Sequence, residues 1–232
     1  MNNLNLSFKP ITPAGRSIAP LIDHTLLKPE AVEKQFVWLC NEASHYGFAS
    51  ACVPPARIKL AVQCLKGSEV RTGSVIGFPF GYNASSIKAE EAALAVDEGA
   101  DELDMVMAIA ALKDKNLRHV LDDIKQVVKA ATGKTVKVII ETCFLTREEK
   151  ITACKLVIDG GAQFVKTSTG LAGGATEDDV RLLHETAGKA ILVKASGGIR
   201  SGRDASTMIR AGAARIGTSS GVAIVTETDL SG

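Results

Sequence analysis

The sequence predicts an α/β fold built as a single (β/α)8 TIM barrel with a short N-terminal extension. Amphipathic segments repeatedly end near a glycine, and a short apolar run follows each one: the glycines are Gly47, Gly67, Gly99, Gly133, Gly161, Gly188 and Gly212. Glycine just past a helix adopts the left-handed cap conformation, and a β-rich run after it indicates a strand. The alternation fills the 232 residues without a low-complexity linker. An open, doubly wound sheet is the alternative that the same rhythm permits.

Eight apolar runs supply the strands that a closed barrel needs. Several are almost continuously apolar, as expected for parallel strands that are covered on both faces. In chain order the runs are PLIDHTLL (20–27), FASACVP (48–54), RTGSVIGFP (71–79), ADELDMVM (100–107), TVKVIIET (135–142), AQFVKTST (162–169), AILVKASG (190–197) and ARIGTSS (214–220).

The segments between these runs carry helix signals. Apolar residues at helical spacing define one face in two of them: Val32, Phe36, Leu39 or Cys40, and Ala43 in the first, and Val120, Ile124, Val127 or Val128, and Ala131 in the second. The segment 176–187 begins with Thr-Glu-Asp-Asp, an N-cap followed by an acidic first turn. We therefore expect residues 1–16 to form a tail or a cap at the bottom of the barrel, and residues 17–232 to form the barrel domain.

Composition and charge argue against some classes of partner and indicate a cellular location. The net charge is +1 and only 4% of the residues are aromatic, so no nucleic-acid partner is predicted. The N-terminus lacks an apolar signal-peptide core, and no apolar stretch is long enough to span a bilayer, so no membrane partner is predicted. Five cysteines, an odd number without a CxxC pair, favour a reducing compartment. The predicted location is cytoplasmic.

Two lysines stand in apolar strands within matching surroundings. FVKTSTG (164–170) places Lys166 after an apolar pair, and LVKASGG (192–198) repeats the pattern around Lys194. Lysine is rarely buried without a partner, so the repeat calls for a joint explanation. Two lysines that reach from strand ends into solvent are the alternative reading. The small residues that follow both lysines leave room for a ligand and favour a functional site.

A pair of neighbouring lysines predicts a nucleophilic amine. Two ammonium groups about 6 Å apart repel each other by about 2.8 kcal/mol at an effective dielectric of about 20, near two pKa units. Burial acts in the same direction. One lysine then becomes neutral near physiological pH and can attack a carbonyl carbon to form a Schiff base.

Acidic residues in the same layer would serve such chemistry. Asp104 lies inside an apolar strand, where a carboxylate needs partners, and the two lysines are natural ones. Asp23 lies inside the first strand. A direct catalytic role and a structural hydrogen bond to loop backbone at the barrel mouth are equally supported for it. Asp101 and Glu102 stand at the start of their strand and are predicted to face solvent.

Glycine-rich turns after the last strands predict an anion site. SGGIRSG (196–202) and GTSSG (217–221) follow the seventh and eighth strands, and STGLAGGAT (168–176) follows the sixth. Barrels often hold phosphate at the loops after strands 7 and 8, where backbone N–H groups point at the ligand. Arg200 adds charge there or faces solvent.

Other reactive side chains point to no further chemistry. His24, His45, His119 and His184 are scattered, and no HxH or HExxH spacing is present, so no catalytic metal is expected. Cys52 lies inside the second strand, as a small hydrophobe or at the border of the pocket. Glu141 ends the fifth strand and is a candidate organiser of polar contacts.

Motifs along most of the chain, from about Leu21 to Val225, closely resemble those of the class I 2-deoxy-D-ribose-5-phosphate aldolases. The resemblance implies a (β/α)8 barrel that reversibly cleaves 2-deoxy-D-ribose 5-phosphate to D-glyceraldehyde 3-phosphate and acetaldehyde in deoxynucleoside catabolism. It also implies no cofactor and a homo-oligomer, dimer or tetramer. The motifs are IDHTLLKP, DELDMV, KVIIETCFLT, FVKTSTG, GGAT, VKASGGIR and GVAIV.

The resemblance also implies residue roles. Lys166 matches the Schiff-base lysine, Lys194 the lysine that lowers its pKa, and Asp104 the aspartate that shuttles protons with a bound water. Asp23 and Thr25 match positions near the substrate hydroxyls. The implied substrate and phosphate positions also include Cys52, Thr169, Gly170, Gly197, Gly198, Gly217, Ser219 and Ser220.

The chain departs from the family pattern in two places. Some members carry a C-terminal tyrosine that reaches the site, whereas the last tyrosine here is Tyr82. After Asp-Met-Val many members have Ile-Asn-Ile-Gly, whereas this chain has Met107-Ala108-Ile109-Ala110. Three rival functions are compatible with the same fold: another phosphosugar lyase or isomerase, a regulatory sugar-phosphate binder without turnover, and a metal-dependent aldolase.

Overall fold

The computed structural model describes residues 8–227 and shows a closed barrel of eight parallel strands in sequential order, β1-β2-β3-β4-β5-β6-β7-β8. The predicted fold class and all eight predicted strands are confirmed. Residues 1–7 of the predicted tail and residues 228–232 of the predicted barrel domain lie outside the described residues. The strands are β1 (Ile22–Thr25), β2 (Ser50–Val53), β3 (Arg71–Ile76), β4 (Glu102–Val106), β5 (Thr135–Ile139), β6 (Phe164–Lys166), β7 (Leu192–Ser196) and β8 (Arg215–Thr218).

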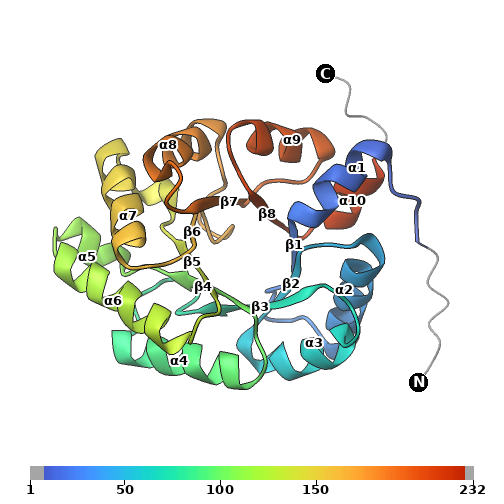
Figure 1. Ribbon diagram of the computed structural model, residues 1–232, viewed down its shortest axis with the longest axis horizontal. Coiled ribbons are helices and arrows are strands. Elements are labelled where there is room, and N and C mark those ends of the chain that lie inside the picture. Colours follow the sequence, from blue (N-terminus) through green and yellow to red (C-terminus); the bar gives the residue numbers. More distant parts are fainter. Residues whose placement is uncertain (1–7, 228–232) are drawn as a thin grey trace.

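Helices alternate with the strands and form an outer ring around them (Figure 1). A helix must cover the outer face of each parallel strand because that face is apolar. The α-helices are α1 (Pro13–Ile18), α2 (Glu33–Tyr46), α3 (Ile58–Leu65), α4 (Ser85–Asp97), α5 (Ile109–Lys113), α6 (Leu117–Ala130), α7 (Arg147–Asp159), α8 (Glu177–Ala187), α9 (Gly202–Arg210) and α10 (Gly221–Thr226), with short 3₁₀ turns η1 (Ala19–Leu21), η2 (Pro55–Arg57) and η3 (Thr142–Phe144).

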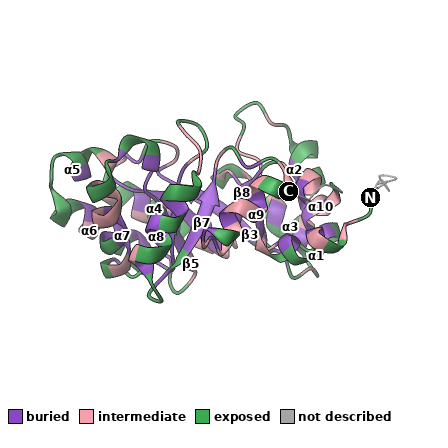
Figure 2. Ribbon diagram, turned by 90° about the horizontal axis from the view of Figure 1, so that it is seen from above, coloured by how far each residue is buried: buried purple, intermediate pink, exposed green. Residues whose placement is uncertain are grey.

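The predicted helix faces lie in the core between strands and helices, which Figure 2 shows as the buried interior of the molecule. Phe36, Leu39, Cys40 and Ala43 of α2 are buried, as are Val120, Ile124, Val127 and Ala131 at α6 and its C-terminal end. Val32 is different: it caps α2 from outside the first turn and is 49% exposed, because the helix begins only at Glu33. The predicted N-cap Thr176 accepts a hydrogen bond from the backbone N–H of Asp179.

The strand register decides which side chains meet inside the barrel. Lys166 of β6 pairs directly with Lys194 of β7, and Lys194 pairs with Arg215 of β8. On the other side, Asp104 of β4 pairs with Lys137 of β5. Paired residues on neighbouring parallel strands face the same side of the sheet, so these long polar side chains share the interior.

The first helix closes the barrel at the junction of its two ends. α1 packs beside α10, and the backbone N–H of Thr12 donates to the carbonyl oxygen of Val225 at 3.0 Å. Gly15 allows this approach, since a Cβ there would lie 2.1 Å from that carbonyl oxygen. α1 spans the predicted boundary between residues 16 and 17.

A fully buried ion pair ties α4 to α6. Lys88 Nζ donates to Asp123 Oδ2 at 2.7 Å and to the carbonyl oxygen of Val106 at 3.0 Å, and the Ser85 hydroxyl donates to Asp123 Oδ1 at 2.8 Å. Val106 ends β4, two residues after Asp104, so the pair fixes the end of the strand that carries Asp104. Within residues 8–227, no helix has the length and apolar character needed to cross a bilayer.

Replacing Asp123 by alanine is expected to lower the free energy of unfolding by about 3–5 kcal/mol, because the variant leaves the Lys88 ammonium buried without its counter-charge. Urea denaturation measures the change. Asp122→Asn is the matched control, since the neighbouring Asp122 pairs with Arg118 on the exposed face of the same helix. Equal effects of the two substitutions would contradict the role given to the buried pair.

Candidate active site

Asp104 lies at the centre of the barrel interior and binds three lysines. Its Oδ2 accepts from Lys166 Nζ at 2.7 Å and from Lys194 Nζ at 2.6 Å, while its Oδ1 accepts from Lys137 Nζ at 2.9 Å. The three lysine residues and Asp104 are each at most 5% exposed. Because the Lys166 and Lys194 amines both contact Asp104 Oδ2, the distance between them cannot exceed the sum of their two distances to that oxygen.

The surroundings shift the pKa values of the two lysines in opposite directions. Burial lowers the pKa of Lys166, the Asp104 carboxylate opposes this, and the nearby Lys194 adds to the lowering, so the net pKa falls below its ordinary value. Burial also acts to lower the pKa of Lys194, but Asp104 and Asp23 outweigh it and raise the net value. Lys194 therefore stays protonated, and Lys166 is the amine that loses its proton more easily.

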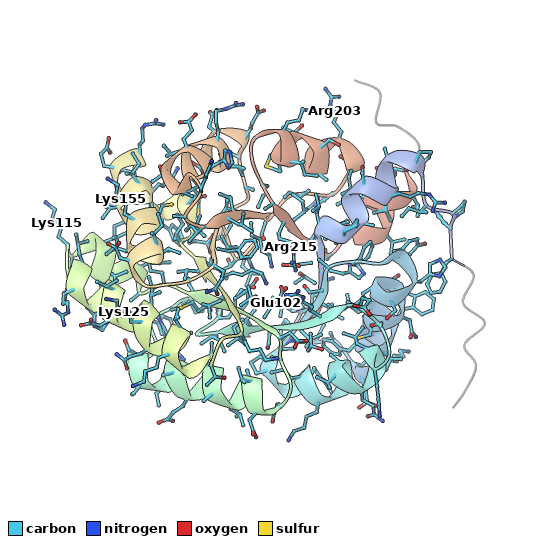
Figure 3. All side chains as sticks on the ribbon, viewed as in Figure 1. Glu102, Lys115, Lys125, Lys155, Arg203 and Arg215 are labelled. Atoms are coloured by element: carbon cyan, nitrogen blue, oxygen red, sulfur yellow. The ribbon has the colours of Figure 1, made fainter. Side chains whose placement is uncertain are left out.

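A second layer of charged groups surrounds this centre. Asp23 Oδ2 lies 2.5 Å from Lys194 Nζ, and Asp23 Oδ1 accepts from Arg215 and from the Ser50 hydroxyl. Glu102 Oε2 accepts from Lys137 Nζ at 2.6 Å and from Arg215 Nη2 at 2.8 Å. Figure 3 shows Arg215 and Glu102 pointing toward one another in the middle of the barrel.

The prediction that Glu102 faces solvent is wrong. Glu102 is 1% exposed, because it lies two residues before Asp104 on β4 and therefore faces the same side of the strand, where Lys137 and Arg215 neutralise it. Asp101, its neighbour, is 41% exposed and pairs with Lys134 as a partly solvated group. Lys137 and Arg215 were not singled out from the sequence. Lys137 carries the same signal as Lys166, a lysine inside an apolar strand.

The charges inside the barrel nearly cancel. Burial would raise the pKa of Asp104, but Lys137, Lys166 and Lys194 lower it well below its usual range. Asp23 behaves alike: burial is overcome by Lys137, Lys194 and Arg215. Three carboxylates (Asp23, Glu102 and Asp104) then face four cations (Lys137, Lys166, Lys194 and Arg215). Loss of one proton from Lys166 makes the buried set electrically neutral.

Cys52 and Thr25 lie on the neighbouring strands β2 and β1, where they pair with each other in register. Burial and the Asp104 carboxylate raise the pKa of the Cys52 thiol to about 11, although the three interior lysines oppose them, so the thiol is neutral at physiological pH. The Thr25 hydroxyl donates to the carbonyl oxygen of Asp23. Thr25 and Ser219 also border a cavity of about 510 Å³ whose other walls include Leu26, Trp38 and Glu42.

The loop after β6 is tied down by Glu141. The hydroxyl of Thr169 donates to Glu141 Oε2 at 2.5 Å and its backbone N–H donates to the same oxygen at 3.1 Å, so Thr169 serves as the anchor of this loop. Gly170 and Gly197 have φ values of 86° and 90°. A Cβ on Gly197 would lie 2.8 Å from the carbonyl oxygen of Gly173, so glycine there permits the loops after β6 and β7 to touch.

The remaining predicted anion residues divide between loop and strand. Gly198 and Ser219 are exposed and Ser220 is half-buried, as expected for loops that receive a ligand. Gly217 lies within β8, not after it, and pairs with Ser196 and Asp23. A Cβ on Gly217 would lie 2.3 Å from Ser196 Oγ and 2.9 Å from Lys194 Cε. Gly217 thus makes room for those side chains.

The arrangement can perform covalent carbonyl chemistry. Lys166 presents a buried amine with a lowered pKa, Asp104 and Lys194 form a proton-exchanging pair beside it, and glycine-rich loops lie at the ends of the same strands. No group of three or more His, Cys, Asp or Glu side chains in the described part of the chain is arranged to hold a metal ion. Fold and site together define a lysine-dependent (β/α)8-barrel protein.

The chain belongs to the DeoC/LacD family of aldolases, whose sequence model matches residues 17–227. A deoxyribose-phosphate aldolase of Carboxydothermus hydrogenoformans is 56% identical over 217 residues, covering 91% of this chain and 95% of the relative. A structure from Coccidioides immitis superposes with a TM-score of 0.91 at 42% identity, covering 98% of this chain and 91% of that one. The tetrameric deoxyribose phosphate aldolase of Aeropyrum pernix gives a TM-score of 0.86 at 36% identity, covering 91% and 90%.

Gly217→Ala is expected to lower the free energy of unfolding by about 1–3 kcal/mol, because the added methyl overpacks the space filled by Ser196 and Lys194. Thermal or urea unfolding measures the loss. Gly73→Ala is the matched control, since a Cβ at this glycine of β3 would meet its nearest atoms at an ordinary 3.6 Å. If Gly217→Ala were as stable as Gly73→Ala, the close packing described for Gly217 would be wrong.

Proposed function

We propose that the protein is a class I deoxyribose-phosphate aldolase, which reversibly cleaves 2-deoxy-D-ribose 5-phosphate to D-glyceraldehyde 3-phosphate and acetaldehyde. The observation that carries the proposal is the shared Asp104 Oδ2, which holds the Lys166 and Lys194 amines together inside the barrel. Membership of the aldolase family and relatives with this name support the substrate. The activity belongs to deoxynucleoside catabolism.

The cycle begins with attack of the neutral Lys166 amine on C1 of the aldehyde. The resulting carbinolamine loses its oxygen as water, with a proton supplied through the Asp104–Lys194 pair, and a protonated imine forms. The C3 hydroxyl then gives its proton to the same pair as the C2–C3 bond breaks. The bonding electrons form the enamine, the C3 carbon becomes the aldehyde of glyceraldehyde 3-phosphate, and the imine nitrogen is the electron sink.

The second half of the cycle restores the enzyme. Glyceraldehyde 3-phosphate leaves, C2 of the enamine takes up a proton, and one water adds to the imine carbon. Cleavage of the C–N bond releases acetaldehyde and returns the Lys166 amine, so the water lost on imine formation is regained. The cycle uses no metal or organic cofactor. The buried network around Asp104 keeps bulk water away from the imine while charge moves.

The loops after β6, β7 and β8 support a phosphate site at one end of the substrate. Gly170, Gly197, Gly198, Ser219 and Ser220 lie there, and their backbone N–H groups are the donors that a phosphate accepts. We further propose that the protein works as a homo-oligomer, as the tetrameric relative from Aeropyrum pernix does. Its five free cysteines support a cytoplasmic location.

Acetaldehyde with borohydride is expected to add a reduced two-carbon adduct to Lys166, because the imine forms there. Mass mapping of peptides locates the adduct. Lys166→Met should abolish it and lower kcat at least ~10³-fold. Lys155→Met is the control, since this lysine faces solvent on the outer ring (Figure 3) and should leave both readouts unchanged. An adduct on another lysine would remove the central assignment.

Lys194→Leu is expected to move the ascending limb of the pH–rate profile to higher pH by about one to two units. The Lys194 charge disfavours the protonated form of Lys166, so its removal raises the pKa of Lys166 and leaves less neutral amine at any given pH. Profiles of kcat/KM against pH measure the shift, with Lys155→Leu as the control. A limb that stays in place would show that burial alone sets the pKa of Lys166.

A further inference from the structure

The Ser196 hydroxyl is a buried polar group that the proposed cycle does not use. Ser196 is 4% exposed, yet its Oγ has no hydrogen-bond partner among the described residues. A buried hydroxyl without a partner costs stability, and alanine would avoid that cost at nearly the same volume. A partner that arrives with a ligand would satisfy this hydroxyl.

The Ser196 hydroxyl faces the interior above Lys194. Ser196 ends β7 two residues after Lys194, so both side chains lie on the same side of the strand. The position that a Cβ on Gly217 would take lies 2.3 Å from Ser196 Oγ and 2.9 Å from Lys194 Cε. The serine hydroxyl and the lysine stem occupy the space that a side chain at Gly217 would fill, so the two groups lie next to each other in the barrel interior.

The backbone of Ser196 is held firmly while its hydroxyl is left unpaired. The backbone N–H of Ser196 donates to Thr167 Oγ1 at 3.1 Å, and the Thr167 hydroxyl donates to the carbonyl oxygen of Ser196 at 3.2 Å. Thr167 directly follows Lys166, so this clamp joins the strand ends that carry the two lysines. Because the backbone is held in place, the unpaired hydroxyl is already positioned before a ligand binds.

The position along β7 selects which part of a substrate Ser196 meets. Lys194, two residues earlier, lies with Asp104 beside the amine of Lys166, and Gly197, the next residue, lies in the predicted phosphate loop 196–202 just beyond β7. In a sugar phosphate whose C1 forms the imine and whose phosphate lies in that loop, the C3 and C4 hydroxyls lie between these two ends. The C3 hydroxyl must lie at Asp104 to lose its proton, so the C4 hydroxyl is the one that falls at Ser196.

We propose that Ser196 is a specificity-determining residue that hydrogen-bonds the C4 hydroxyl of the substrate, which is the hydroxyl next to the aldehyde of glyceraldehyde 3-phosphate. The inference rests on the proposed function and goes beyond it. Ser196 selects a phosphorylated 2-hydroxyaldehyde as the partner of acetaldehyde. Ser168, two residues after Lys166, carries a second buried hydroxyl without a partner in residues 8–227, but no strand pairing fixes its direction.

The test compares two acceptors in the synthetic direction with acetaldehyde as donor. D-Glyceraldehyde 3-phosphate carries the hydroxyl, and 3-oxopropyl phosphate lacks it. The wild-type protein is expected to prefer the hydroxylated acceptor in kcat/KM by about 3- to 10-fold through this one hydrogen bond, and Ser196→Ala should lose that preference. Borohydride trapping of acetaldehyde on Lys166 should be unchanged in Ser196→Ala, because the donor half does not reach the serine.

Two further variants separate recognition from folding. Ser196→Cys keeps the shape of the side chain but offers only a weak donor. Its ratio of kcat/KM between the two acceptors should therefore equal that of Ser196→Ala. Ser74→Ala removes a fully buried hydroxyl of β3 that already donates to the carbonyl oxygen of Val53, so it should lower the Tm without changing the ratio. Ser196→Ala should keep or raise the Tm, because it removes an unpaired polar atom.

Equal loss of kcat/KM with both acceptors in Ser196→Ala, or an unchanged preference, would overturn the proposal. Loss of acetaldehyde trapping in this variant would also overturn it, since the hydroxyl would then act at the imine. Failure of the proposed function is a separate result: the wild-type protein would show no cleavage of 2-deoxy-D-ribose 5-phosphate.

Discussion

One carboxylate shared among three lysines holds the interior of this protein together. Asp104 binds Lys137 with one oxygen and both Lys166 and Lys194 with the other. A buried charge is tolerated only when it is paired, so each of these side chains depends on the others for its place. The interior holds three carboxylates and four cations, so one positive charge has no counterpart. That charge is lost when the Lys166 amine, which attacks the substrate, gives up its proton. Electrostatic balance and reactivity thus have one origin.

The barrel register makes this sharing possible. β4 and β5 send the paired charges Asp104 and Lys137 inward, and β6, β7 and β8 send Lys166, Lys194 and Arg215 inward in register. Between the two groups, Lys166 pairs with the apolar Ile139 of β5, so the lysines of β5 and β6 meet at Asp104 from different levels. Helices supply the apolar packing outside, and the Lys88–Asp123 pair fixes the end of β4 from that side. The interior can therefore be filled with charged groups that serve chemistry, because stability comes from the layer between strands and helices.

The sequence predicted the barrel, its eight strands and the juxtaposition of Asp104, Lys166 and Lys194. Periodic glycines and apolar runs are local signals, and the repeated Val-Lys motif is visible by inspection. Alternation along β4 places Glu102 on the same side as Asp104, and Lys137, like Lys166, is a lysine inside an apolar strand. The burial of Glu102 at the start of β4 and the presence of Arg215 beside it depend on the stagger between strands that are far apart in the chain, which the sequence does not show. The sequence also predicts Gly217 in the loop after the eighth strand, whereas it lies within β8, because a strand of four residues carries no clear signal of where it ends.

The contact between α1 and α10 constrains how this protein can be made. Thr12 and Val225 are 213 positions apart, and Arg215 reaches Asp23 across 192. A ribosome adds roughly 5–20 residues per second, so the first helix waits on the order of 10–40 s for its partner to be synthesised. Until then β1 has an unpaired edge and Asp23 lacks its guanidinium, which leaves the nascent chain dependent on late, long-range closure and open to chaperone binding in the interval.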